Sequence, residues 1–230
     1  MGYNQQQNPM ITTSVQREQP IRFAGSELGA HRHICGFFRT PEEEYHLLLP
    51  FIKEGIDRGE KAYHVVDPKL REDHLQRMKS AGIDVSEAEN SGQFELCNWG
   101  QMYLRNGYFD QDRMLETWRG VLAAAGQRGF SRTRLVAHME WALEDREGVS
   151  DLIEYEAKFN LMHQSDRDPV ICTYDLTKFS GDVIMGVLRT HPMVIIGGVL
   201  QENPFFIPPE RFLQELRERR GRDGSQPAGK

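Results

Sequence analysis

Three carboxylates follow the first apolar segment of this chain, at a position where a phosphate-binding loop would carry glycines. Residues 33–38 predict a buried strand, and an apolar helix begins after it. A phosphate cradle needs small residues, whose backbone N–H groups wrap the anion, and a lysine that reaches it. Here Thr40 is a suitable N-cap, Pro41 suits the first helical position, and Glu43 completes a capping box. The three glutamates at 42–44 would also repel a phosphate, so we expect no phosphate site at this turn.

The same strand carries residue types that bind metals. His31, His33 and Cys35 share one face of the strand because side chains alternate with a period of two. Imidazole and thiolate groups bind zinc and other soft metals. Ligands at this spacing need partners from elsewhere, and the sequence contains no spaced Cys/His pair that supplies them. We therefore interpret His33 and Cys35 as core residues and predict no metal and no cofactor, with a metal or haem sensor as the least favoured alternative.

A carboxylate ends another predicted strand. His138 and Glu140 share a face of that strand, and Trp141 follows. Ligands of open α/β sheets bind outside the carboxyl ends of the strands. A buried carboxylate there can act as a catalytic base, accept a hydrogen bond from a ligand, or anchor a backbone amide. Without a phosphate cradle we expect one of the last two roles and no catalytic residue. The alternative is a divergent ATPase that uses Glu140 as its base.

Further polar and aromatic residues extend the predicted pocket. Glu156 and Asn160 lie one turn apart on a predicted helix and share a face, and Tyr174 and Asp175 end another strand. The connection at 98–109 is unusually aromatic, which is typical of a loop that covers a pocket, although local packing or a dimer contact explains it equally well. The candidate ligand-binding residues are Trp99, Tyr103, Glu140, Trp141, Glu156, Asn160, Tyr174 and Asp175.

Alternating strand-like and helix-like segments must position these residues. Helix-length segments separate the predicted strands, which implies right-handed crossovers and a mostly parallel, doubly wound α/β sheet with helices on both faces. Residues 1–28 are polar and without periodicity, so we expect a flexible N-terminal leader, and residues 220–230 predict a disordered tail. One domain then covers residues 29–219. The predicted strands are residues 33–38, 61–66, 93–97, 134–139, 170–174 and 193–196.

Composition excludes several classes of protein. The chain is 39% hydrophobic and 27% charged, with a net charge of −6 and no extended basic block, which argues against direct nucleic-acid binding. It has no apolar run of membrane-spanning length and no apolar signal segment, so we expect no membrane association. Cys35, Cys97 and Cys172 form no C-x-x-C pair. An odd number of core-like thiols suits a reducing compartment, and we expect a cytoplasmic protein.

Several segments together resemble the MEDS family (methanogen/methylotroph, DcmR sensory domain) over about residues 30–212. The resemblance implies a single RecA/KaiC-like domain, related to ATPases of that type, that has lost the phosphate-binding loop. It also implies a sensory role: the binding of a small, apolar or one-carbon-derived ligand. The signal would pass to a signalling or transcription-regulatory partner, or through self-association as a homodimer. A protein–protein interaction module without a ligand is a further alternative. The segments that carry the resemblance are 33–35, 50–56, 58–65, 139–143, 155–157 with Asn160, 172–175 and 191–195.

Overall fold

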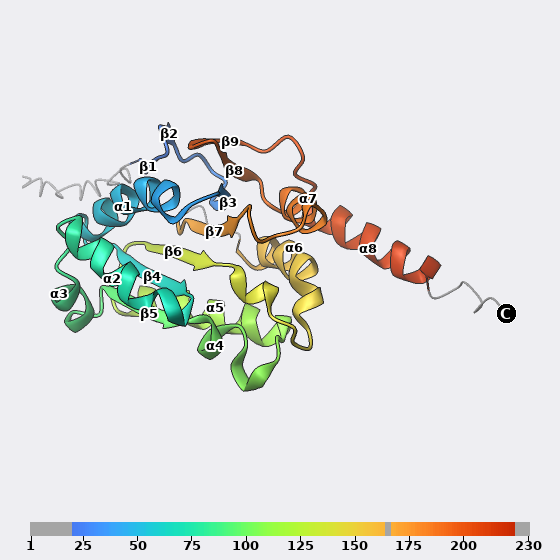
Figure 1. Ribbon diagram of the computed structural model, residues 1–230, viewed down its shortest axis with the longest axis horizontal. Helices are drawn as coiled ribbons and strands as arrows, with labels where there is room; N and C mark the ends of the chain where they lie inside the picture. Colours follow the sequence, from blue (N-terminus) through green and yellow to red (C-terminus); the bar gives the residue numbers. More distant parts are fainter. Residues whose placement is uncertain (1–19, 164–166, 224–230) are drawn as a thin grey trace, which may run out of the picture.

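A seven-stranded sheet forms the centre of the molecule (Figure 1), in a computed structural model that describes residues 20–163 and 167–223. The strand order is β5-β4-β6-β7-β3-β8-β9, and every pairing is parallel except β8 with β9. This confirms the predicted mostly parallel sheet. The strands are β3 (His33–Phe38), β4 (Lys61–Val66), β5 (Phe94–Asn98), β6 (Thr133–His138), β7 (Val170–Asp175), β8 (Met193–Ile196) and β9 (Val199–Glu202).

Helices cover both faces of the sheet, and each face has its own hydrophobic core. On one face lie α1 (Pro41–Asp57), α2 (Arg71–Ser80) and α3 (Val85–Asn90). The other face carries α4 (Trp99–Met102), α5 (Gln111–Gln127), α6 (Leu152–Met162) and α7 (Gly181–Thr190). The last helix, α8 (Pro209–Asp223), packs on α6 and α7 and projects from the body (Figure 1). No helix among the described residues is long and apolar enough to cross a membrane.

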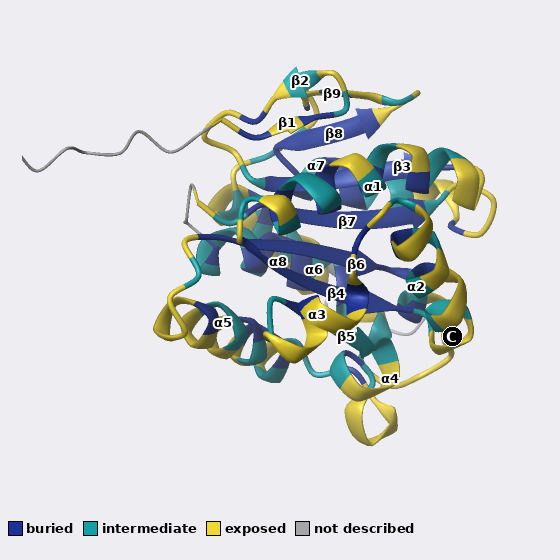
Figure 2. Ribbon diagram, turned by 90° about the vertical axis from the view of Figure 1, so that its left-hand side faces the viewer, coloured by how far each residue is buried: buried dark blue, intermediate teal, exposed yellow. Residues whose placement is uncertain are grey.

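The central strands are buried on both faces, as Figure 2 shows in dark blue. Every residue of β3, β4 and β6 is buried, including the polar residues of β4 and β6. Side chains alternate between the two cores. On β7, Cys172 and Tyr174 belong to the core under α5 and α6, whereas Ile171 belongs to the core under α1. This alternation decides on which side of the sheet each functional side chain lies.

The ends of the domain differ from the sequence prediction. The expected flexible leader at 1–28 is wrong for residues 21–28, where β1 (Arg22–Phe23) and β2 (Ser26–Glu27) form a hairpin. Ile21, Phe23 and Leu28 are buried in the hydrophobic core under α1. Burial of these apolar side chains holds the segment in place. Residues 1–19 lie outside the described residues. At the other end, residues 220–223 continue α8, and the rest of the expected tail, 224–230, also lies outside them.

The aromatic connection at 98–109 is not one continuous loop. It contains α4 and the 3-10 helix η2 (Arg105–Gly107). The Asn98 side chain accepts a hydrogen bond from the Gln101 backbone N–H at 2.9 Å and so caps α4. Three further 3-10 segments lie at the ends of strands or helices: η1 (Pro68–Leu70), η3 (Glu140–Leu143) and η4 (Val149–Asp151).

Candidate functional site

A small pocket lies at the carboxyl ends of β3, β6 and β7, where α1 begins. This edge of an open α/β sheet is the usual place for a ligand. The pocket has a volume of about 50 Å³, which is room for a molecule of only a few heavy atoms. The residues that line it are Phe38, Thr40, Pro41, Glu44, Tyr45, Leu70, Asp73, His138, Glu140, Thr173, Tyr174, Asp175 and Lys178.

The turn from β3 into α1 is closed by its own side chains. Thr40 Oγ1 accepts a hydrogen bond from the Glu43 backbone N–H at 3.2 Å. In return, Glu43 Oε2 accepts one from the Arg39 backbone N–H at 2.9 Å. Pro41 is the first helical residue, and three glutamates fill the first turn. The predicted N-cap at Thr40 is confirmed, whereas the Glu43 carboxylate accepts from the N–H of Arg39 and not from that of Thr40, which a standard capping box would require. Both bonds occupy N–H groups of the turn that would otherwise be free to hold a phosphate.

Three side chains around the pocket each carry a polar atom without a hydrogen-bond partner among the described residues: Glu44 Oε1, His138 Nε2 and Glu140 Oε2. His138 is 2% exposed, and its Nε2 lies 3.4 Å from Glu44 Oε1, which is longer than a normal N–H···O hydrogen bond. An unpartnered buried polar group costs about 1–3 kcal/mol. A ligand that supplied the missing partners would remove this cost.

The charges around the pocket are mainly negative. Burial raises the pKa of the Glu140 carboxyl, although His138 and Lys178 act against that shift. Lys178 Nζ lies 3.6 Å from Glu140 Oε1 and 3.0 Å from Asp175 Oδ2. Because carboxyl groups outnumber this lysine, the pocket favours a small cation or a hydrogen-bond donor over an anion. The carboxyl groups that line the pocket belong to Glu44, Asp73, Glu140 and Asp175.

Behind the pocket, a chain of buried rings connects α1 to the sheet. Tyr45 Oη lies 2.6 Å from His74 Nδ1, and His74 Nε2 lies 2.9 Å from His64 Nδ1. Burial, together with the neighbouring histidines, lowers the pKa of His64 to about 3 and holds that of His74 well below its usual value. Both rings are therefore neutral at physiological pH, and short hydrogen bonds join the three side chains, whereas His64 Nε2 has no partner among the described residues.

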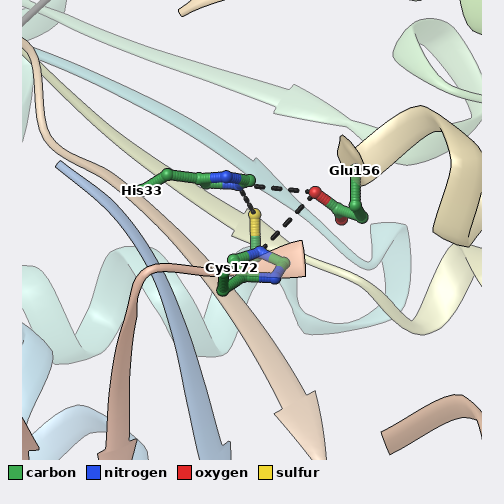
Figure 3. A group of neighbouring side chains, drawn as sticks. His33, Glu156 and Cys172 are labelled. Atoms are coloured by element: carbon green, nitrogen blue, oxygen red, sulfur yellow. Dashed lines mark hydrogen bonds and ion pairs between the residues drawn. The ribbon is translucent and has the colours of Figure 1, made fainter. Parts of the chain in front are cut away.

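A second polar group is buried on the opposite face of the sheet (Figure 3). His33 from β3, Cys172 from β7, Glu156 from α6 and His191 after α7 each offer one donor atom, and these atoms all lie within 4.8 Å of one another. Glu156 Oε2 is 3.4 Å from His33 Nε2 and 3.6 Å from His191 Nε2. Cys172 Sγ is 3.6 Å from His33 Nε2. None of the four residues is more than 5% exposed.

The environment sets the protonation of this group. Burial would raise the pKa of Glu156, but His191, His33 and the hydrogen bond from Tyr174 together hold it below its usual value. Burial, with His33 nearby, lowers the pKa of His191 to about 3. Burial and the charge of Glu156 raise the pKa of the Cys172 thiol. At neutral pH the group therefore holds a carboxylate, a neutral imidazole at position 191 and a protonated thiol.

Tyr174 connects the two regions. Its hydroxyl donates to Glu156 Oε1 at 2.9 Å, and the same residue lines the pocket. Asn160 lies beside Glu156 on α6, and its Oδ1 is 3.0 Å from His33 Nδ1. Of the candidate residues from the sequence, Glu140, Tyr174 and Asp175 thus meet at the pocket. Glu156 and Asn160 join Tyr174 on the other face.

The other three aromatic candidates, Trp99, Tyr103 and Trp141, lie elsewhere. Tyr103 stacks on Trp141, with ring centroids 4.5 Å apart and planes 9° from parallel, and both rings are buried. Phe109 packs against the same pair. Trp99 is partly buried against this core, which lies under α5 and α6. None of these rings is among the residues that line the pocket, and burial of aromatic area explains their positions.

Sequence reasoning missed part of the buried group. It considered His33 for a metal and Glu156 for a pocket, but it did not bring the two together and did not include Cys172 or His191 among the candidate site residues. The signal that could have joined them is strand pairing: β3 and β7 are neighbours, with Cys35 in register with Cys172. The Cys35 thiol itself lies 3.7 Å from the Met193 carbonyl and is not one of the four.

Comparison with known proteins now identifies the family. The model of the MEDS family, "MEthanogen/methylotroph, DcmR Sensory domain", matches residues 32–192. The chain belongs to the MEDS family. The matched range of this MEDS domain includes the whole pocket lining and all four residues of the buried group.

The domain is also similar to one protein in sequence and to another in structure. It is 28% identical over 182 residues to the transcriptional repressor DcmR of Methylorubrum extorquens (strain DSM 6343 / CIP 106787 / DM4), a match that covers 77% of this chain and 64% of the repressor. The MEDS domain therefore spans less than two thirds of that relative. A KaiC-like protein of Pyrococcus horikoshii OT3 has the same fold, with a TM-score of 0.50, 17% identity and coverage of 71% of this chain and 70% of its own. The expected KaiC-like fold is confirmed.

Proposed function

We propose that this MEDS domain is a non-catalytic sensory module that binds a small, one-carbon-sized molecule at the carboxyl edge of its sheet. The signal would pass to a transcription-regulatory partner protein or to a second copy of the chain. The observation that carries the proposal is the set of unpartnered polar atoms of Glu44, His138 and Glu140 around a pocket of about 50 Å³. A sensory family and a relative that is a transcriptional repressor support the regulatory output.

The lining of the pocket narrows the class of ligand. An apolar molecule would leave Glu44, His138 and Glu140 without hydrogen-bond partners, at a cost in free energy for each. A molecule that donates hydrogen bonds satisfies them, and a positive charge adds attraction to the surrounding carboxylates. Methylammonium is the simplest one-carbon compound with both properties. We expect it to bind more tightly than methanol, and formate not to bind.

Nucleotide hydrolysis does not fit the start of α1. Thr40 occupies the Glu43 N–H, Glu43 occupies the Arg39 N–H just before the helix, and the glutamates of the first turn repel phosphate. A ligand that binds the native state raises the melting temperature. We expect Mg-ATP to leave the melting temperature of the chain unchanged. A rise that depends on ATP concentration would instead favour the divergent ATPase.

Exposed apolar side chains near the β8–β9 hairpin offer a surface on which a partner protein or a second copy of the chain could bind. Ile196 is 48% exposed, Val199 is 54% exposed and Phe205 is 56% exposed. Burial of such side chains is what a partner protein or a second copy would gain on contact. Light scattering over a range of concentrations, with and without ligand, separates these two routes, since only self-association changes the mass of the purified chain.

Calorimetric titration at pH 7 tests the pocket. Methylamine hydrochloride should give a saturable heat, methanol a weaker one and sodium formate none. The double variant Glu44→Gln/Glu140→Gln keeps the shape of the pocket but removes its charge, and we expect it to lose the methylamine heat. Glu144→Gln, at an exposed position nearby, is the matched control. An unchanged heat in the double variant, or no heat from any of the three probes, would overturn the assignment.

A further inference from the structure

We propose that His33, Glu156, Cys172 and His191 form a binding site for a transition-metal ion of the zinc type. The four side chains come from β3, α6, β7 and the turn after α7, so the chain must be folded for the site to exist. This site is separate from the ligand pocket, and the two proposals fail independently of each other.

Three of the six distances between the donor atoms match those of a tetrahedral metal site, and all six are within 4.8 Å. Around a tetrahedral zinc with bonds of about 2.0–2.3 Å, neighbouring ligand atoms lie about 3.3–3.8 Å apart. Here the separations are 3.4 Å for His33 Nε2 to Glu156 Oε2, 3.6 Å for His191 Nε2 to the same oxygen, and 3.6 Å for Cys172 Sγ to His33 Nε2. The two nitrogen–oxygen distances are long for hydrogen bonds, which normally span 2.7–3.2 Å.

The outer hydrogen bonds direct the Nε2 lone pairs of both imidazoles toward the centre of the group. Asn160 Nδ2 donates to the carbonyls of Thr190 (2.6 Å) and Glu156 (3.0 Å), so its Oδ1 must accept from His33 Nδ1–H. His191 Nδ1 lies 2.9 Å from the Val187 carbonyl and donates to it. Each ring therefore carries its proton on Nδ1, which is the usual arrangement of a metal-bound histidine.

With the ring protons on Nδ1, the Nε2 lone pairs of the two histidines face the Glu156 carboxylate. The Cys172 thiol lies 3.6 Å from His33 Nε2, whereas His191 Nε2 has no hydrogen-bond partner within the described part of the chain. A cation at the centre of the group would bind all of these acceptors at once. Two imidazoles, a thiol that ionises on metal binding and a carboxylate are ligands that zinc accepts, and soft thiolate excludes magnesium and calcium.

A bound ion would connect the site to the rest of the domain. Four protein ligands close the coordination shell of zinc, which is typical of a structural centre and not of a catalytic one. The ion would join β3 and β7 to α6 and to the end of α7. Because Tyr174 donates to Glu156 Oε1 and also lines the pocket, the metal would help to fix one wall of the ligand site.

Metal titration of the full-length chain tests the proposal. After removal of metal with a chelator, we expect one Zn²⁺ per chain to bind. Co²⁺, a coloured substitute, should give visible bands of tetrahedral coordination and a thiolate-to-cobalt charge-transfer band. Cys172→Ala should lose that band and at least about 100-fold in zinc affinity, and Asn160→Ala should lose about 10- to 100-fold.

Controls separate the site from other cysteines and from misfolding. The variant Cys35→Ala/Cys97→Ala leaves Cys172 as the single cysteine of the chain, and it should keep the charge-transfer band and the stoichiometry. This variant decides the matter even if Cys172→Ala does not fold. The proposal is overturned if the wild-type chain binds no stoichiometric zinc, or if the band is absent from the single-cysteine variant while that variant is folded by circular dichroism.

Discussion

Two glutamates are buried among the residues that the structure describes, and their surroundings differ. Glu60, at the amino ends of the strands, is 4% exposed and lies 2.5 Å from Arg132 Nη1 and 2.5 Å from Arg134 Nε. Glu156, on α6, is 1% exposed, and its nearest cation candidates are histidine nitrogens at 3.4 and 3.6 Å. The first carboxylate has permanent cations within hydrogen-bond distance. The second faces two imidazoles whose Nδ1–H groups donate to Asn160 Oδ1 and to the Val187 carbonyl, and the low pKa of His191 keeps that ring neutral.

The difference separates a structural ion cluster from a candidate binding site. A buried charge needs either a partner or a change of protonation. Glu60 has its partners in the chain itself, so nothing further is required there. Glu156, like Glu44 and Glu140 at the pocket, has polar neighbours whose geometry is incomplete. The incomplete geometry around these three carboxylates is the basis of the two proposed sites.

The largest effect is expected when the Glu60 cluster is broken. Arg134→Met removes one guanidinium and its hydrogen bond to the Phe51 carbonyl. We expect a loss of about 3–5 kcal/mol in the free energy of unfolding, measured in urea, because a buried carboxylate loses a partner. Arg119→Met breaks the exposed pair with Glu116 and should cost less than about 1 kcal/mol. Equal losses in the two variants would contradict the contrast.

Zinc should stabilise the Glu156 site and leave the Glu60 cluster unaffected. At a free concentration 100 times the dissociation constant, a bound ion adds about 2.7 kcal/mol to the free energy of unfolding. We expect a corresponding rise in melting temperature for the wild-type chain and for the control Arg119→Met, and no rise for Glu156→Gln. A zinc-dependent rise in Glu156→Gln would show that the ion binds elsewhere.

The stability of the metal-free chain should fall with pH in the range where histidines titrate. The folded pKa of His191 is about 3, below the value of about 6.5 in an unfolded chain, so the unfolded state takes up the proton first. The stabilisation that comes from the neutral, buried ring is complete above pH 6.5. It is lost as the pH falls from there toward 3, by about 1.4 kcal/mol in the free energy of unfolding per pH unit for each such histidine. Urea unfolding at pH 7, 6 and 5 measures the slope. His191→Gln should reduce it by about one proton, and an unchanged slope would contradict the buried neutral ring.

The smallest effect concerns the cap of α1. Thr40→Ala removes the side-chain acceptor of the Glu43 N–H and should cost about 1 kcal/mol in the free energy of unfolding. We expect its zinc affinity to equal that of the wild-type chain, because the cap lies on the opposite face of the sheet from Glu156. Thr40→Ser keeps the acceptor and should restore most of the stability. A serine variant as unstable as the alanine variant would show that the hydroxyl is not what matters.

Local features of the fold could be predicted, because they depend on neighbouring residues. The cap at Thr40 and the buried strands follow from spacing, capping chemistry and apolar runs, and the structure confirms them. The β8–β9 hairpin was missed. Its signal is the Gly197-Gly198 pair, whose positive φ angles of 59° and 80° suit a tight hairpin turn.

The candidate site could be predicted only in part, because the order of the strands in the sheet is what brings its residues together. The strand end at Glu140 and the polar face of Glu156 and Asn160 were visible in the sequence. The contact of Glu156 with His33 and Cys172 depends on the pairing of β3 with β7, two strands that are far apart along the chain. Nothing in local periodicity specifies which parallel strands become neighbours, so the buried group appears only in the folded chain.

Diffraction from crystals grown with methylamine would test the central claim most directly, namely that this domain senses a small molecule at the edge of its sheet. We expect density for one small molecule within hydrogen-bond distance of Glu44, His138 and Glu140, with the Thr40 cap intact. Ordered water alone in the pocket of crystals soaked at saturating methylamine, or a nucleotide bound over the start of α1 in crystals grown with Mg-ATP, would contradict it.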